Sequence, residues 1–255
     1  MCEIVICFIM SLSVGILIFL LGLFWPVIPK SYRQFILRRF WGRGVLGKDF
    51  VVCYGAFLDS RVTEGKGDEL RYVKRYHDGR IFKFRGPWGN VVADAEIRSA
   101  SYIINTLSKY RKKAVPVIDD TTAFENLNRT FVSLGSSSSN QTTQLILREP
   151  NNEFLDFGQE ENTFFILDKK SGKRFVGFQE PVRKDYGMVL RIPNLRFPGD
   201  LFFVCAGLGE WGTSGAAWYL TAKWLDLKAE FGNAAFGLVV EVELGSDQSA
   251  RRVFP

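Results

Sequence analysis

Histidine is almost absent from this chain of 255 residues, which has one histidine and four cysteines. A zinc site built from His and Cys needs several such ligands at short, paired spacing, and no such spacing occurs, so no metal centre and no cofactor are expected. A Ser-His-Asp triad would have to use His77, which falls in a predicted hairpin turn. Cys53 and Cys205 lie inside apolar runs. They are typical of small core residues in a reducing compartment and not of a disulfide framework.

A common phosphate-loop signature is missing too. The chain does not contain G-x-x-x-x-G-K-[ST], and no internal repeat is evident. A cleaved secretory signal is also disfavoured, because Glu3 stands where a positive charge is expected and Trp25, Pro26 and Pro29 replace a small-residue cleavage site.

One long apolar run is present, from Ile4 to Ile28, without a charged residue. At about 1.5 Å per helical residue it is long enough to cross a hydrocarbon layer of about 30 Å. Basic residues follow it at once: Lys30, Arg33, Arg38, Arg39, Arg43 and Lys48. The positive-inside rule then places the rest of the chain in the cytoplasm, with Tyr32 and Trp41 suited to an interfacial aromatic belt.

The domain organisation follows from this reading. We expect a single-pass transmembrane anchor over 1–29, a basic juxtamembrane linker over 30–47 and one cytoplasmic α/β domain over 48–255. The formal charge of +6 is largely explained by the basic flank, which is attracted to anionic headgroups by about 1 kcal/mol per basic residue. The lipid bilayer is therefore the expected partner, and nucleic acid is not expected to be one.

Two strand–loop–helix units indicate the fold class. A strand over 130–134, a small-residue loop over 135–140 and a helix from 141 form the first; a strand over 200–206, a Gly-rich loop over 207–215 and a helix over 216–227 form the second. They predict a three-layer α/β fold with a Rossmann-like mixed sheet, parallel in its centre, and an added β-hairpin. Further predicted elements are strands 48–57, 114–118, 185–192 and 235–244, a helix 94–113, and hairpins 71–84 and 162–178. Pro116 pushes its strand to an edge.

The two loops are the candidate ligand site, because ligands of such sheets bind beyond the carboxyl ends of the strands. Small residues let the backbone approach a ligand, and helix-start N–H groups favour an anion. The predicted ligand-binding residues are Gly135, Ser136, Ser137, Ser138, Ser139, Asn140, Gly207, Gly209, Gly212, Thr213 and Ser214. The alternative is that the glycines only make tight turns. The basic hairpin 71–84 is read as a solvated, lipid-facing edge, with phosphate or nucleic-acid contact as its alternative.

The second loop, Gly209-Glu-Trp-Gly-Thr213, resembles the late Gly-Gly-x-Gly-Thr loop of cytokinin-activating LOG-type proteins and related Rossmann-like sensor domains. The resemblance covers one or two loops. It implies recognition of a nucleotide or its derivative. LOG proteins carry a Glu a few residues after the Gly-Thr, whereas Ser214 to Trp218 follow here, so the resemblance does not extend to LOG-type hydrolysis.

Carboxylates offer a route to catalysis. Asp119 and Asp120 follow a predicted strand and can act as a base, with Glu96 or Glu210 as partner. A helix cap or turn is the alternative role for the Asp pair.

The sequence thus favours a membrane-tethered domain that recognises a nucleotide or other phosphate-bearing small molecule. This layout is similar to that of bacterial signalling or antiphage effectors. The alternatives are a membrane-associated hydrolase that cleaves a nucleotide or glycosidic bond, and a non-catalytic assembly protein that forms homo-oligomers.

Overall fold

The computed structural model describes residues 30–56, 63–64, 71–75, 81–85, 92–161, 163–177 and 183–255. The chain divides into two compact units, Met1–Leu37 and Arg38–Pro255. The expected anchor over 4–28 and His77 lie outside the described residues. Within the described ranges, no helix combines the length and apolar character that crossing a membrane requires.

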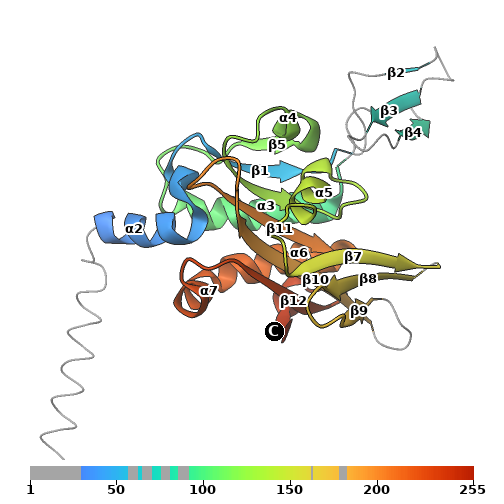
Figure 1. The fold of residues 1–255 in the computed structure, drawn as a ribbon. Helices are drawn as coiled ribbons and strands as arrows, with labels where there is room; N and C mark the ends of the chain where they lie inside the picture. Colours follow the sequence, from blue (N-terminus) through green and yellow to red (C-terminus); the bar gives the residue numbers. More distant parts are fainter. Residues whose placement is uncertain are drawn as a thin grey trace, which may run out of the picture. The chain divides into compact units, whose positions relative to one another are not determined.

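A seven-stranded mixed sheet is the centre of the second unit (Figure 1), with the order β13-β12-β10-β11-β6-β1-β5. Strands β5, β1, β6 and β11 are parallel, whereas β10, β12 and β13 pair antiparallel. The predicted mixed α/β sheet is therefore confirmed, but its parallel strands fill the half from β11 to the edge strand β5 and not the centre alone. The edge position of β5 is the one that Pro116 indicates. The strands are β1 (Phe50–Tyr54), β5 (Val117–Asp119), β6 (Thr130–Leu134), β10 (Lys184–Pro193), β11 (Leu201–Gly207), β12 (Phe236–Glu243) and β13 (Arg251–Phe254).

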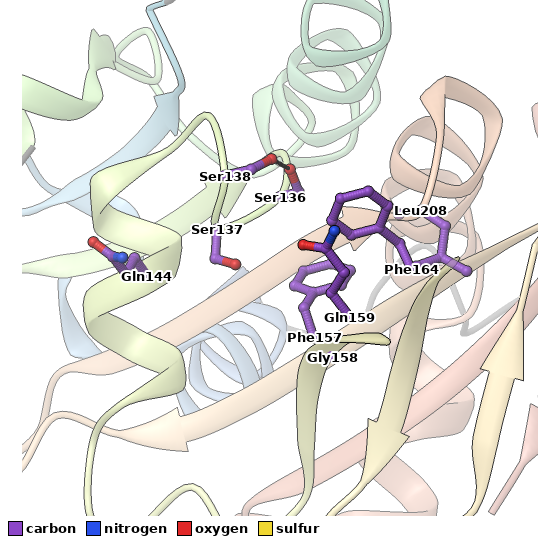
Figure 2. Close-up of a pocket in the computed structure, with 10 residues that line it drawn as sticks. Ser136, Ser137, Ser138, Gln144, Phe157, Gly158, Gln159, Phe164 and Leu208 are labelled. Carbon is purple, nitrogen blue, oxygen red and sulfur yellow. Dashed lines mark hydrogen bonds between the residues drawn. The ribbon is translucent and has the colours of Figure 1, made fainter. Parts of the chain in front are cut away.

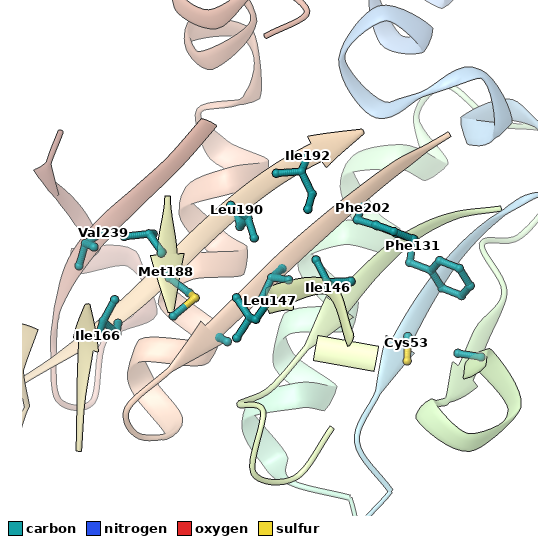
Figure 3. Packing of buried hydrophobic residues seen from close by; sticks show 14 of the residues in the cluster. Cys53, Phe131, Ile146, Leu147, Ile166, Met188, Leu190, Ile192, Phe202 and Val239 are labelled. Carbon is teal, nitrogen blue, oxygen red and sulfur yellow. The ribbon is translucent and has the colours of Figure 1, made fainter. Parts of the chain in front are cut away.

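Successive strand residues face opposite sides of the sheet, so each central strand contributes to two cores. On one side, Phe131 and Leu190 belong to an apolar cluster (Figure 3). This cluster also holds residues of α4 (Asp120–Glu125), α5 (Gln141–Leu147) and a small antiparallel sheet of β7 (Leu155–Glu160), β8 (Thr163–Asp168) and β9 (Arg174–Val176).

The other side of the sheet is covered by α3 (Asp94–Ser108), α6 (Glu210–Ala222) and α7 (Trp224–Phe231). The close approach of α6 depends on glycine, because a Cβ on Gly187 of β10 would lie 2.0 Å from the carbonyl oxygen of Gly212 in α6. Helices on both faces make the sheet the middle of three layers, which is consistent with a Rossmann-like arrangement.

The basic segment folds as α2 (Lys30–Trp41) and the 3₁₀ turn η2 (Arg43–Leu46). Trp41 is fully buried and its ring centroid lies 5.2 Å from that of Phe203. The expected interfacial position of Trp41 is therefore wrong, because the aromatic ring is enclosed by the apolar side of the sheet. The compact unit begins at Arg38, inside the expected linker.

A buried arginine holds the end of α2. Arg191 on β10 is 2% exposed and donates to the carbonyl oxygens of Phe40, Arg39 and Ala234 at 3.0, 3.1 and 2.7 Å. Burial lowers its pKa to about 10. Since the last carbonyls of a helix have no partner within the helix, this guanidinium supplies their donors.

Some element boundaries differ from those expected. The second loop is shorter than predicted, because α6 begins at Glu210, so Gly212, Thr213 and Ser214 lie inside the helix. The predicted helix 94–113 ends at Ser108. The basic hairpin forms as β3 (Arg71–Arg75) and β4 (Ile81–Arg85), with β2 (Thr63–Glu64) alongside β3. Strands β7 and β13 and helix α7 were not predicted.

Candidate functional site

A pocket of about 450 Å³ lies where the β6–α5 loop, the end of β11 and the β7–β8 hairpin meet (Figure 2). It is the place where the sequence predicts a ligand, beyond the carboxyl ends of parallel strands. The lining residues are Ser136, Ser137, Ser138, Gln144, Phe157, Gly158, Gln159, Phe164, Gly207 and Leu208. Four of the eleven predicted ligand-binding residues, the three serines and Gly207, thus line one cavity.

Hydroxyl groups form one wall. The Ser136 and Ser138 Oγ atoms lie 2.6 Å apart in a hydrogen bond (Figure 2). The loop closes on itself, since the carbonyl of Ser136 accepts from the N–H groups of Ser139 at 3.1 Å and Asn140 at 3.0 Å. Gly135 starts this turn with a φ of +94°, where a side chain is strained. The tight turn presents the serine side chains to the pocket.

Aromatic rings form the opposite wall. Phe157 and Gln159 come from β7 and Phe164 from β8 (Figure 2). Phe164 is 55% exposed, so its ring is open to solvent beside the cavity. Gly158 is required between them, because a Cβ there would lie 2.2 Å from the Phe165 ring. The residues of this wall were not predicted from the sequence. Gly158, between Phe157 and Gln159, could have indicated them, because a glycine within a strand can mark the close approach of another group.

The start of α5 already has internal acceptors. The Asn140 side chain accepts from the N–H groups of Thr142 and Thr143 at 2.8 and 3.0 Å, and it donates to the Leu134 carbonyl at 2.7 Å. The N–H of Gln141 donates to Asp120 at 2.8 Å. These bonds satisfy the helix-start donors that the sequence assigned to an anionic ligand.

The start of α6 is occupied by a carboxylate from the same chain. Asp185, at the beginning of β10, is fully buried and accepts from the N–H groups of Gly212 at 2.6 Å and Gly209 at 3.1 Å. Burial raises the pKa of this carboxyl group, although its backbone hydrogen bonds act in the opposite direction. The negative charge expected at this helix terminus is therefore intramolecular.

The other predicted residues of the second loop have structural contacts as well. The Thr213 hydroxyl accepts from the Gly207 N–H at 2.9 Å, and Ser214 forms hydrogen bonds with Asp247 and with Arg98 of α3. Gly209, Gly212, Thr213 and Ser214 are not among the residues that line the pocket, and neither are Gly135, Ser139 and Asn140. Their contacts order the loops around it.

The three candidate carboxylates bind backbone N–H groups. Asp119 caps α4 through the N–H of Thr122 at 2.9 Å. Asp120 also accepts from the N–H of Ala56 at 3.1 Å, and Glu96 accepts from that of Gly55 at 3.0 Å. None of the three lines the pocket, and hydrogen bonding of this kind is what loop-ordering carboxylates do.

The described lining of the pocket carries no charged side chain. It therefore offers hydroxyl and amide groups opposite aromatic faces, which suits a planar ring with polar substituents. Within the described residues, no group of three His, Cys, Asp or Glu side chains is placed to hold a metal ion.

Comparison of the chain with protein-family models, curated proteins and solved structures finds no match. The pocket is consequently the main indication of what the protein binds.

Proposed function

We propose that this protein is a single-pass membrane protein whose three-layer, Rossmann-like domain binds a nucleotide or other phosphate-bearing small molecule as a sensor or effector. In this proposal residues 4–28 form the anchor and the domain faces the cytoplasm, as the basic flank favours. The ligand would contact Ser136 to Ser138 on a loop that its own hydrogen bonds already hold in a tight turn, and α2 would connect the domain to the anchor.

The pocket between the two small-residue loops is the observation that supports this proposal most. A nucleobase stacked on the exposed ring of Phe164 would cover apolar surface now in contact with water. Sugar hydroxyls would meet the serine hydroxyls across the cavity of about 450 Å³. The position of the pocket, beyond the carboxyl ends of β6 and β11, is where Rossmann-like sheets bind their ligands.

Calorimetry of the full chain in nanodiscs, titrated with a panel of nucleosides and nucleotides, tests the proposal. We expect one class of ligand to bind in the micromolar range. Phe164→Ala should weaken binding about tenfold, because stacking of one base contributes about 1–3 kcal/mol. Leu225→Ala on α7 is the matched control, since Leu225 is 50% exposed and does not line the pocket.

The alternatives give different outcomes in the same experiment. Absence of binding at high micromolar concentration would contradict ligand recognition. Turnover of a bound nucleotide that is lost in Asp119→Asn or Glu96→Gln would favour the hydrolase. A ligand-free chain that forms stable oligomers would favour the assembly protein.

Membrane anchoring is tested separately by extraction of membranes with alkaline carbonate. The full chain should stay in the pellet, and a chain that lacks residues 1–29 should be released. Release of the full chain would contradict the anchor and leave the ligand proposal unaffected.

A further inference from the structure

The charge of a phosphate-bearing ligand needs a partner that the first pocket does not offer. Its described lining is uncharged, and the start of each flanking helix is occupied by Asp120 and Asn140 or by Asp185. If the proposed function holds, cationic groups close to this pocket must bind the phosphate.

A second cavity of about 300 Å³ has such groups and shares one lining residue, Gln144, with the first. Arg148 and Arg196 line it, together with Glu149. Gln144 and Arg148 are four residues apart at the end of α5, so they lie on the same side of that helix. Gln144 therefore lines both cavities, which adjoin at this residue.

Arg196 is positioned for recognition of an anion. It lies between β10 and β11, and its Nη2 atom is 3.2 Å from Oε1 of Glu149. The Glu149 side chain is 5% exposed and that of Arg196 54% exposed, so a buried carboxylate orients a guanidinium that still faces solvent. A guanidinium has five N–H donors in a planar fork, which is more than one carboxylate oxygen accepts. The geometry of this fork matches that of the oxygens of a phosphate.

We propose that Arg148 and Arg196 bind the phosphate of a ligand whose ring system occupies the pocket between the two loops. The inference rests on the proposed function and deepens it, since it assigns the anionic and the uncharged parts of one ligand to two adjoining cavities. Gln144 lies at the junction and contacts the part between them. Because contacts between a guanidinium and a phosphate are charge-assisted, the phosphate contribution to affinity falls as salt is added.

Calorimetry with pairs of nucleosides and their 5′-monophosphates tests the assignment on the full chain in nanodiscs. In the wild type the nucleotide should bind about tenfold more tightly than its nucleoside, as two charge-assisted contacts to one phosphate allow. Arg196→Gln and, independently, Arg148→Gln should reduce this ratio to about twofold and leave nucleoside affinity unchanged. Arg251→Gln is the matched control, because Arg251 is also an exposed arginine paired with a largely buried glutamate, Glu241, and lies away from both cavities.

Inorganic phosphate separates the two cavities further. It should compete with the nucleotide for the chain and leave nucleoside binding unchanged.

Equal affinity for nucleoside and nucleotide in the wild type would overturn the inference and leave the proposed function standing. The inference also fails, and the proposed function again stands, if Arg196→Gln and Arg148→Gln weaken nucleoside and nucleotide alike. A chain that binds neither ligand overturns both proposals.

Discussion

Replacement of Asp185 tests whether the start of α6 is built around an internal anion. The carboxylate accepts from Gly212 N–H in a fully buried bond, and from Gly209 and Tyr186 N–H in partly buried bonds of 3.1 and 2.8 Å. Asp185→Ala leaves three donors without their acceptor and opens space that water enters only in part.

The magnitude follows from the burial of each donor. A buried donor left without an acceptor costs about 1–3 kcal/mol, and a partly buried one costs less because water replaces the acceptor. Release of the desolvated carboxylate offsets part of the loss. We therefore expect Asp185→Ala to reduce the free energy of unfolding by about 3 kcal/mol, which lowers Tm by about 6–12 °C for a domain of this size.

Asp185→Asn should fall between the wild type and Asp185→Ala. The amide oxygen still accepts from two N–H groups, whereas the amide NH₂ meets the N–H of Gly212 and cannot accept from it. Added formate should stabilise Asp185→Ala more than the wild type, because this anion supplies a carboxylate of the size that the substitution removes.

Thermal unfolding followed by circular dichroism, with and without formate, measures both effects. Asp226→Ala is the control, since the Asp226 side chain on α7 is 74% exposed and its ion pair with Lys223 spans 3.6 Å, so its loss should change stability by less than about 0.5 kcal/mol. An Asp185→Ala variant no less stable than Asp226→Ala would refute the reasoning.

Three further predictions concern the frame of the site. Arg191→Met should lower the free energy of unfolding by about 2–4 kcal/mol in urea titrations, because three backbone carbonyls lose a charged donor; a loss under about 1 kcal/mol would contradict the role assigned to this guanidinium. Desolvation raises the pKa of Glu241. Hydrogen bonds from Lys184, Arg251 and Tyr186 outweigh this effect and hold that pKa below the ordinary 4.5. The stability that Glu241 contributes is therefore complete above about pH 4.5 and is lost as the pH falls further, so Glu241→Gln should flatten the decline of Tm between about pH 5 and pH 3; an unchanged slope would argue against this linkage. Gly158→Ala should cost about 1–3 kcal/mol by chemical denaturation, since the new methyl group meets the Phe165 ring, and a neutral effect would show that the β7–β8 hairpin shifts freely.

Local sequence patterns predicted the first strand–loop–helix unit correctly. The strand 130–134 and the helix 141–147 have the observed boundaries, because a run of apolar residues, a turn-forming Gly and a capping Asn act over a few residues. The second unit was predicted less accurately, since the local pattern places Gly212 in a loop. Glycine disfavours a helix locally, but in α6 the Cβ of any other residue would lie 2.2 Å from the Tyr186 carbonyl oxygen, so packing against β10 decides its identity.

The residues of the candidate site also differ in whether local sequence patterns predict them. Ser136 to Ser138 and Gly207 could be predicted because loops that follow parallel strands gather at one edge of a sheet. Phe164 could not, since β7, β8 and β9 form a separate sheet that reaches this edge by packing of its apolar side chains against distant segments.

By itself, the sequence determined that the chain contains a mixed α/β sheet with two small-residue loops at one edge, because hydrophobic periodicity and turn chemistry are local properties. Only the tertiary structure decided which side chains from distant segments contact those loops and the sheet. Asp185 lies 24 residues before Gly209, and Trp41 precedes the Phe203 that encloses it by most of the chain. Such pairings depend on desolvation and close packing between distant segments, and those forces exist only after the sheet has formed.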